Sequence, residues 1–231
     1  MLLPDHAYVK AASLDDCLAR LAERPAATRL VGGGTDVIFN MRLRLFRPEV
    51  ALSIRGLPEL QQVEELPDGG LRIGAGCRLA VLEHDPRIRG RYPALADAIH
   101  AVASTHVRNM ATLGGNVCLE TRCWYTNNSE QWRDGVSSCF KTEGQLCHVI
   151  KTSTVCHAIN NADTPVALIA LGATLELRSA EGSRRVPIAG FYRRDGMRHT
   201  VLRPGELVTH VELPPVTDRT VFLKLAPRAG M

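Results

Sequence analysis

The chain has 231 residues, a formal net charge of +4, and 45% apolar and 23% charged residues, which is the composition of a globular protein rather than a disordered or fibrous one. Its unbroken apolar runs, such as residues 166–171, are far shorter than the ~20 residues of a membrane-spanning helix. Scattered basic residues and an aromatic content of only 5% also argue against a nucleic-acid-binding surface.

Secondary-structure signals in the first half of the chain alternate between helix and strand. Ser13 is a good N-cap, and the apolar residues that follow it keep helical spacing, so we expect a helix that ends before Pro25. Further elements are predicted as strands at residues 28–31, 51–54 and 71–73 and as a helix at 93–103.

Residues 118–157, here called the cysteine-rich segment, differ from the rest of the chain. They are polar and show no sustained period, and a structureless loop of about forty residues inside a domain needs a physical reason, which a bound metal centre would provide. After it, Asp163 is predicted to cap a helix over 164–171, and strands are predicted at 174–178 and 207–213. Strands and helices without a regular βαβ repeat indicate an α+β fold.

Two glycine-rich stretches each lie beside an apolar segment. The first glycine loop is Val31-Gly32-Gly33-Gly34-Thr35-Asp36, and the second is Ala111-Thr112-Leu113-Gly114-Gly115-Asn116. Glycines let the backbone approach a ligand closely, and successive amides can form a nest for anionic oxygens. Neither loop follows the Rossmann or the phosphate-loop pattern. One such loop is more often a sharp turn, but two of them make a diphosphate ligand an equally good interpretation.

Five of the seven cysteines fall in the cysteine-rich segment. An odd number of cysteines and the absence of an N-terminal export signal argue against a disulfide framework, so we expect a cytoplasmic location. Structural zinc sites use closely spaced pairs of ligands, so wider spacing favours an iron–sulfur cluster over zinc, with scattered buried thiols as the alternative. The candidate ligands, with 15, 7 and 8 residues between them, are Cys123, Cys139, Cys147 and Cys156.

The two glycine loops resemble the pyrophosphate-binding loops of the FAD subunits of molybdenum hydroxylases, the relatives of xanthine and carbon monoxide dehydrogenases. The opening at residues 11–16 and the later stretch at 205–214 match that family in the same order, so the resemblance covers nearly the whole chain. It implies a flavin-binding domain of the vanillyl-alcohol-oxidase (PCMH) type over residues 1–222, with two α/β subdomains and a cysteine-rich loop insert at 118–157. The subdomains would cover about 1–56 and 57–222, and 223–231 would begin a truncated C-terminal domain.

The resemblance assigns FAD contacts and no catalytic residue to this chain. The two glycine loops would hold opposite sides of the FAD diphosphate, Asp163 would contact the nucleotide half, and residues near the C-terminus would make later contacts. The implied FAD-binding residues are Val31, Gly32, Gly33, Gly34, Thr35, Asp36, Ala111, Thr112, Gly114, Gly115, Asn116, Asp163, Leu207 and Lys224.

The cysteine-rich segment is similar in position to an insert in the β subunit of 4-hydroxybenzoyl-CoA reductase, which carries a [4Fe-4S] cluster on four cysteines. Thr121-Arg122-Cys123 and Cys147-His148-Val149-Ile150 follow the order of that insert. The resemblance implies an electron-transfer oxidoreductase subunit used in aromatic degradation. Electrons would pass from ferredoxin through the cluster and FAD to a [2Fe-2S] subunit and a molybdenum-cofactor subunit. The complex would be a heterotrimer or a dimer of heterotrimers, without nucleic acid or membrane.

Other functions remain open on the sequence. The chain could be the FAD subunit of another aromatic or heterocycle molybdenum hydroxylase. It could also be a non-catalytic scaffold with a degenerate flavin fold, whose cysteines bind zinc. A standalone flavin oxidase has the least support, because no covalent flavin attachment or pair of substrate bases is visible.

Overall fold

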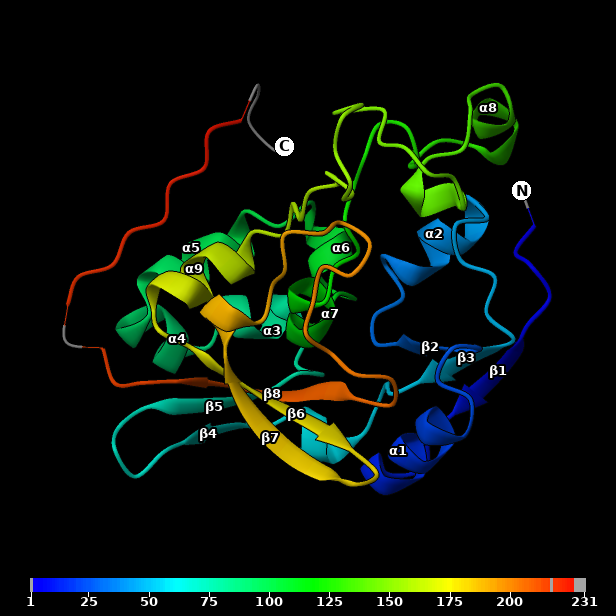
Figure 1. The fold of residues 1–231 in the computed structure, drawn as a ribbon. Helices are drawn as coiled ribbons and strands as arrows, with labels where there is room; N and C mark the ends of the chain where they lie inside the picture. The colour runs from blue at the N-terminus through cyan, green and yellow to red at the C-terminus, as the bar shows by residue number, and fades with distance from the viewer. Residues whose placement is uncertain (1, 217, 227–231) are drawn as a thin grey trace.

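Two sheets of different kinds organise the chain. The computed structural model describes residues 2–216 and 218–226. One sheet is parallel, with three strands in the order β1-β3-β2, and the other is antiparallel, with five strands in the order β4-β5-β8-β6-β7. Figure 1 shows the small sheet beside one end of the large sheet, and most helices above one face of the large sheet. The chain therefore has the mixed helix and strand content that the sequence predicts.

The small sheet is built from the N-terminal quarter of the chain. Its elements are β1 (Ala7–Lys10), α1 (Leu14–Glu23), β2 (Thr28–Val31), α2 (Val37–Arg42) and β3 (Val50–Ser53). Ser13 caps α1 as predicted, because its hydroxyl accepts a hydrogen bond from the Asp16 amide at 3.1 Å. The buried face of α1, which includes Cys17, packs with Leu52 of β3. These contacts confirm the first predicted helix and both predicted strands here.

The large sheet and its helices hold the main core. Its strands are β4 (Val63–Glu65), β5 (Leu71–Gly74), β6 (Thr174–Ser179), β7 (Gly182–Pro187) and β8 (Leu207–Leu213). The helices around it are α3 (Leu79–Glu83), α4 (Pro86–Arg91), α5 (Pro93–His100), α6 (Thr105–Arg108), α7 (Leu113–Val117) and α9 (Thr164–Ala170), with short 3₁₀ turns at Pro58–Leu60 and Ile188–Gly190. Leu95, Leu168 and Val211 are fully buried where α5, α9 and β8 meet. Burial of this apolar layer stabilises the half of the domain that carries the second glycine loop.

The structure corrects several predicted elements. The predicted helix at 93–103 ends at His100, because the chain turns soon afterwards through Ala103, which has a left-handed φ of 44°. The second glycine loop is partly helical, since α7 begins at Leu113. Strands β1, β4 and β7 have no counterpart among the predictions. β7 is an edge strand that exposes Ser183 and Arg185, so it lacks the apolar alternation that marks a strand.

The cysteine-rich segment has little regular structure. It contains α8 (Glu130–Asp134) and a 3₁₀ turn at Phe140–Thr142. Its two ends are joined by a pair of backbone hydrogen bonds between Arg122 and Ile159, at 2.7 and 3.0 Å. The segment is therefore a long excursion closed at a narrow neck. Across the described residues, the helices are all too short or too polar to traverse a bilayer.

A buried ion pair fixes the turn between α5 and α7. The Glu83 carboxylate accepts a hydrogen bond from Arg108 Nε at 2.8 Å and contacts His100 Nδ1 at 2.6 Å. Arg108 also donates to the Val102 carbonyl at 3.1 Å. Burial opposes ionisation of Glu83, but the hydrogen bonds from His100 and Arg108 together outweigh it and lower the pKa of the carboxyl. This pair ties α3 to the turn that precedes the second glycine loop.

We predict that Glu83→Ala lowers the free energy of unfolding by about 3–5 kcal/mol at pH 7, because it leaves the buried Arg108 charge without its partner. The matched control is Glu65→Ala, which removes an exposed ion pair to Arg91 and should cost under about 1 kcal/mol. Urea denaturation measures the free energy of unfolding of both variants.

The stabilisation by Glu83 should also depend on pH. Since the pKa of Glu83 is lowered in the folded chain, its contribution to stability is lost on acidification below the ordinary glutamate pKa. The difference in unfolding free energy between the wild type and Glu83→Ala should then become smaller at acidic pH. Equal losses of unfolding free energy in Glu83→Ala and Glu65→Ala at pH 7 would contradict a stabilising role for the buried Glu83–Arg108 pair.

Candidate functional site

A cavity of about 520 Å³ lies where the two glycine loops meet. One wall comes from the end of β2 and the start of α2, and the opposite wall comes from α7 and the turn before it. Leu207 and Val208 at the start of β8 and the segment around Asp163 close one end. A volume of this size is within the usual range for small-molecule and cofactor sites.

The first glycine loop approaches the second one backbone to backbone. A Cβ atom on Gly33 would lie 1.9 Å from the Met110 carbonyl oxygen, and one on Gly32 would lie 2.8 Å from Thr112 Oγ1. Gly34 has a φ of 75°, a left-handed conformation that disfavours larger side chains. Glycine is therefore required here by contact between the loops, in addition to any ligand.

The second glycine loop begins a short helix and is fixed from its buried side. Thr112 caps α7, because its hydroxyl accepts a hydrogen bond from the Gly115 amide at 3.2 Å. A Cβ on Gly114 would lie 2.6 Å from the Cβ of Ala75. The Asn116 side-chain oxygen accepts a hydrogen bond from the Thr164 hydroxyl at 2.6 Å. The side-chain oxygen of Asn116 thus anchors α9, while the residue still lines the cavity.

Asp163, which also lines the cavity, has a different role from the predicted helix cap. It makes no capping hydrogen bond to α9, and its backbone is already helical, with φ and ψ of −81° and −40°. Its carboxylate instead accepts a hydrogen bond from Lys224 Nζ at 2.9 Å, and Lys224 also donates to the Ala101 carbonyl at 3.0 Å. This ion pair holds the described C-terminal segment against the cavity.

The structure brings nearly all of the predicted FAD-binding residues together. Each of them lines the cavity except Val31, which is buried in β2. The cavity is also lined by residues that no sequence motif marks, among them Ile54, Val102, Val107 and Arg122. The apolar residues look in sequence like ordinary core positions. The position of Arg122 follows from the closure of the neck, which has no local sequence signal.

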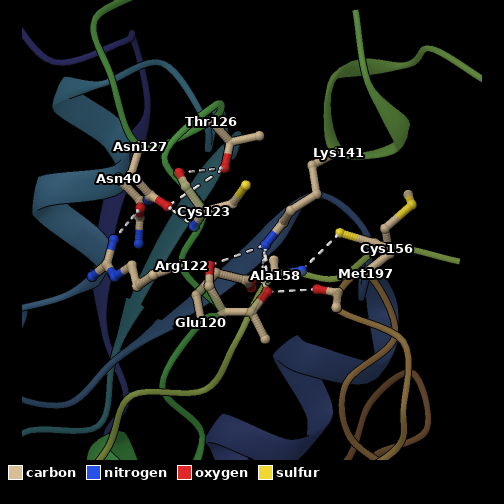
Figure 2. A network of polar contacts seen from close by, with 12 residues as sticks. Asn40, Glu120, Arg122, Cys123, Thr126, Asn127, Lys141, Cys156, Ala158 and Met197 are labelled. Atoms are coloured by element: carbon tan, nitrogen blue, oxygen red, sulfur yellow. Dashed lines mark hydrogen bonds and ion pairs between the residues drawn. The ribbon is translucent and has the colours of Figure 1, made fainter. Parts of the chain in front are cut away.

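Asp36, at the end of the first glycine loop, directs its carboxylate toward neighbouring side chains. The carboxylate forms an ion pair with Arg122 and accepts a hydrogen bond from Asn40 Nδ2 at 3.1 Å. Burial raises the pKa of Asp36, and the nearby Arg122 charge opposes that shift. Arg122 also donates to Asn40 Oδ1 at 3.0 Å, as Figure 2 shows. Asp36 therefore links the first glycine loop to the cysteine-rich segment.

The four candidate cysteine ligands differ in their surroundings. Cys139, Cys147 and Cys156 are buried, whereas Cys123 is partly exposed. Cys156 Sγ accepts a hydrogen bond from the Ala158 amide at 3.4 Å. Burial raises the pKa of Cys156, with smaller contributions from the neighbouring Cys147 and Cys139 thiols. Burial of Cys147 is outweighed by surrounding backbone amides, which lower its pKa.

These thiols do not converge on a single point. Within residues 2–216 and 218–226, no group of three or more histidine, cysteine or acidic side chains is arranged to hold one metal ion. In the view of Figure 2, the Lys141 side chain lies between the sulfur atoms of Cys123 and Cys156. Lys141 Nζ donates to Glu120 Oε1 at 2.7 Å and to the Thr121 hydroxyl at 2.6 Å. Three of the four thiols are thus buried, and in this view Cys123 lies on the other side of Lys141 from Cys156.

Comparison with known proteins gives consistent results. The chain is 35% identical over 219 residues to the aldehyde oxidoreductase FAD-binding subunit PaoB of Escherichia coli K12, which covers 90% of this chain and 69% of that protein. It is 31% identical over 235 residues to the glyceraldehyde dehydrogenase medium chain of Sulfolobus acidocaldarius, covering 100% of this chain and 67% of the relative. The crystal structure of quinoline 2-oxidoreductase from Pseudomonas putida 86 matches with a TM-score of 0.77 and 25% identity, over 100% of this chain and 66% of that one.

The chain thus spans about two thirds of the length of these relatives. Residues 4–216 match the family described as the FAD binding domain in molybdopterin dehydrogenase. That range contains both glycine loops, the neck and the whole cysteine-rich segment. With its two glycine loops at one cavity and this match over most of its length, the chain belongs to the family of FAD-binding domains of molybdopterin dehydrogenases.

Proposed function

We propose that the chain binds one FAD molecule in the cavity and relays electrons within a molybdenum-containing oxidoreductase complex, without forming the substrate site. One observation carries this proposal: two glycine loops, one after β2 of the small sheet and one at the start of α7, meet at a single cavity of about 520 Å³. Contact between the loops accounts for their glycines, and the cavity beside that contact has a volume typical of cofactor sites. The FAD-binding names of the family and of PaoB support the same cofactor.

The chain's part in this function is binding and orientation. The backbone amides of the two glycine loops would hold the FAD diphosphate, since glycines leave them accessible to anionic oxygens. The hydroxyls of Thr35 and Thr112 line the same space and can donate hydrogen bonds. Asp163 and Lys224 would orient the nucleotide half. FAD itself, when bound, supplies the electron transfer, so these residues need no acid–base role.

We predict that Gly115→Leu weakens FAD binding by about tenfold or more, which is ~1.4 kcal/mol of binding free energy. Apart from its chain neighbours and the backbone of α7, a Cβ on Gly115 would have Thr112 Oγ1 as its neighbour, at 3.0 Å, so a larger side chain would extend into the cavity that Gly115 lines. Quenching of flavin fluorescence measures the dissociation constant. The control is Gly90→Ala on the surface of α4, where an added Cβ meets no atom within 4 Å.

Circular dichroism would show that Gly115→Leu keeps its fold. Unchanged FAD affinity in a folded Gly115→Leu variant would remove the second glycine loop from the binding site. A wild-type chain that takes up no FAD at all would favour the scaffold with a degenerate flavin fold.

We further propose that Cys123, Cys139, Cys147 and Cys156 hold a [4Fe-4S] cluster, as the resemblance to the 4-hydroxybenzoyl-CoA reductase β subunit implies. Three of the thiols are buried, and Cys156 accepts an amide hydrogen bond of the kind that tunes iron–sulfur clusters. In such a cluster each thiolate binds a different iron atom, so the four sulfurs surround a body rather than meet at one ion. The four thiols are not gathered in this way among the described residues, so cluster binding would require them to draw together and Lys141 to leave the space between Cys123 and Cys156.

We predict about four iron and four sulfide ions per chain after anaerobic purification. Cys147→Ala should lose most of this iron, because its buried thiolate would bind one corner of the cluster. Cys118→Ala is the matched control, since Cys118 lies in the same stretch but lines the FAD cavity, and its iron content should not change. Zinc without iron in the wild type would exclude the cluster and favour the zinc-binding scaffold.

For the whole complex, we propose a molybdenum-cofactor subunit and a [2Fe-2S] subunit as partners, with ferredoxin as the electron donor in the cytoplasm. This arrangement follows from the 4-hydroxybenzoyl-CoA reductase resemblance, in a heterotrimer or a dimer of heterotrimers. A second candidate is an aldehyde-oxidising complex, because the names of two relatives at 35% and 31% identity refer to aldehyde substrates. In that case electrons would flow from substrate toward FAD.

The purified native complex distinguishes these two candidates. We predict that reduced ferredoxin drives the dehydroxylation of 4-hydroxybenzoyl-CoA, as measured by product analysis. Oxidation of aldehydes with a dye as acceptor, and no reaction of 4-hydroxybenzoyl-CoA, would favour the second candidate.

A further inference from the structure

We propose that Asp36 and Arg122 are positioning residues that couple FAD binding to the order of the cysteine-rich segment. This inference rests on the proposed FAD site, and it does not require the iron–sulfur cluster. The pair joins two parts of the chain that are 86 residues apart in sequence, the end of the first glycine loop and the neck of the cysteine-rich segment. Its consequence is that each part stabilises the ordered state of the other.

Arg122 occupies the neck itself. Its backbone exchanges hydrogen bonds with Ile159, which closes the base of the cysteine-rich segment. Two residues earlier, the Glu120 amide donates to the second carboxylate oxygen of Asp36 at 3.5 Å. The neck is therefore held to the first glycine loop by both a side chain and a backbone group.

The Arg122 side chain contacts one face of α2, and among residues 2–216 and 218–226 its ion-pair partner is Asp36 alone. Its guanidinium pairs with Asp36, donates to Asn40 Oδ1 at 3.0 Å, and lies 5.4 Å from the centre of the Phe39 ring. Asn40 is fully buried, so its orientation is fixed by the fold. These three contacts exist only when the start of α2, and hence the loop before it, has the conformation seen here.

Asp36 is limited as a direct ligand for an anion but is well suited to this positioning role. Its carboxylate is partly buried and carries the same sign of charge as a diphosphate. The hydrogen bonds from Asn40 and Arg122 occupy one carboxylate oxygen, and the Glu120 amide reaches the other. Its side chain is therefore committed to holding the neck rather than to holding FAD.

Coupling follows because both sites use the same backbone. FAD bound to the first glycine loop would favour the ordered conformation of that loop. This is the conformation in which Asp36 and Asn40 can bind Arg122. By linkage, an ordered neck must raise the affinity for FAD by the same factor, which for such couplings is about 5- to 150-fold.

The test compares Arg122→Gln with Arg47→Gln in the full chain. Arg47 also joins the region after α2 to the cysteine-rich segment, through an exposed ion pair with Glu130, but it has no bond to the glycine loop. Hydrogen exchange of residues 123–134 is measured with and without added FAD, and FAD affinity is measured by fluorescence. We expect FAD to slow exchange in the wild type and in Arg47→Gln.

In Arg122→Gln, FAD affinity should fall by about tenfold, within the usual range of such couplings, and FAD should no longer slow exchange in the cysteine-rich segment. Asp36→Asn should behave in the same way, and the double variant should be no worse than either single one, because all three lack the same ion pair. Arg122→Lys, which keeps the charge, should recover part of the effect.

Several outcomes would overturn the coupling. If FAD binds the wild type but leaves exchange in residues 123–134 unchanged, the two parts are independent. If Arg122→Gln weakens FAD binding while FAD still protects the segment, Arg122 is a direct FAD contact only. A wild type that does not bind FAD overturns the proposed function, and this inference with it.

Discussion

The close approach of two backbones is the constraint on which the rest of the site depends. Gly33 lies so near the Met110 carbonyl that even a methyl group would overlap with it, and Gly114 is pressed in the same way against Ala75. The Gly33 contact joins the small parallel sheet to the helical layer of the large sheet, and the Gly114 contact packs α7 against the end of β5. A side chain at Gly33 would therefore push the two halves apart, whether or not a ligand is bound. The cavity therefore exists because the loops touch, and its position is set by the fold.

Local sequence signals foretold the elements well where one physical preference dominated. The Ser13 cap and the helical spacing after it predicted α1, and short stretches containing apolar residues predicted β2, β3 and β8. Edge strands such as β7 were not foreseen, because their exposed polar residues carry no apolar alternation. Asp163 is of a residue type that often caps helices, yet its carboxylate accepts a hydrogen bond from Lys224, which lies 61 positions away in the sequence. Such a contact depends on tertiary structure and cannot be read from neighbouring residues.

The candidate site shows the same division. Both glycine loops could be found from their composition, and the resemblance to a known family extended the set to Asp163, Leu207 and Lys224, all of which line the cavity. The apolar wall that includes Val102 and Val107 could not be predicted from the sequence. A valine that lines a pocket and a valine in the core have the same sequence pattern.

The cysteine-rich segment has a structural anchor of its own, besides any metal centre. Its length led us to expect a bound metal as the reason for its order. The structure offers polar contacts with the body of the protein as a further reason. Thr121 donates to the Gly196 carbonyl at 2.6 Å, and Arg133 donates to the Leu43 carbonyl at 2.7 Å. Buried hydrogen bonds of this kind stabilise a loop only if all partners are satisfied, so the segment and the body must fold together.

The charges around the cavity explain how an acidic wall can accept an anionic ligand. Asp36, Asp163 and Glu206 line the cavity, and each is paired with a basic residue. The hydrogen bond from Arg184 lowers the pKa of Glu206, so this carboxylate stays ionised within its pair. Because each negative charge is compensated locally, a diphosphate would meet little net repulsion, and attraction can come from the amides of the glycine loops. In the Asp36–Arg122 pair, the contact that holds the neck is therefore also the contact that neutralises the Asp36 carboxylate beside the cavity.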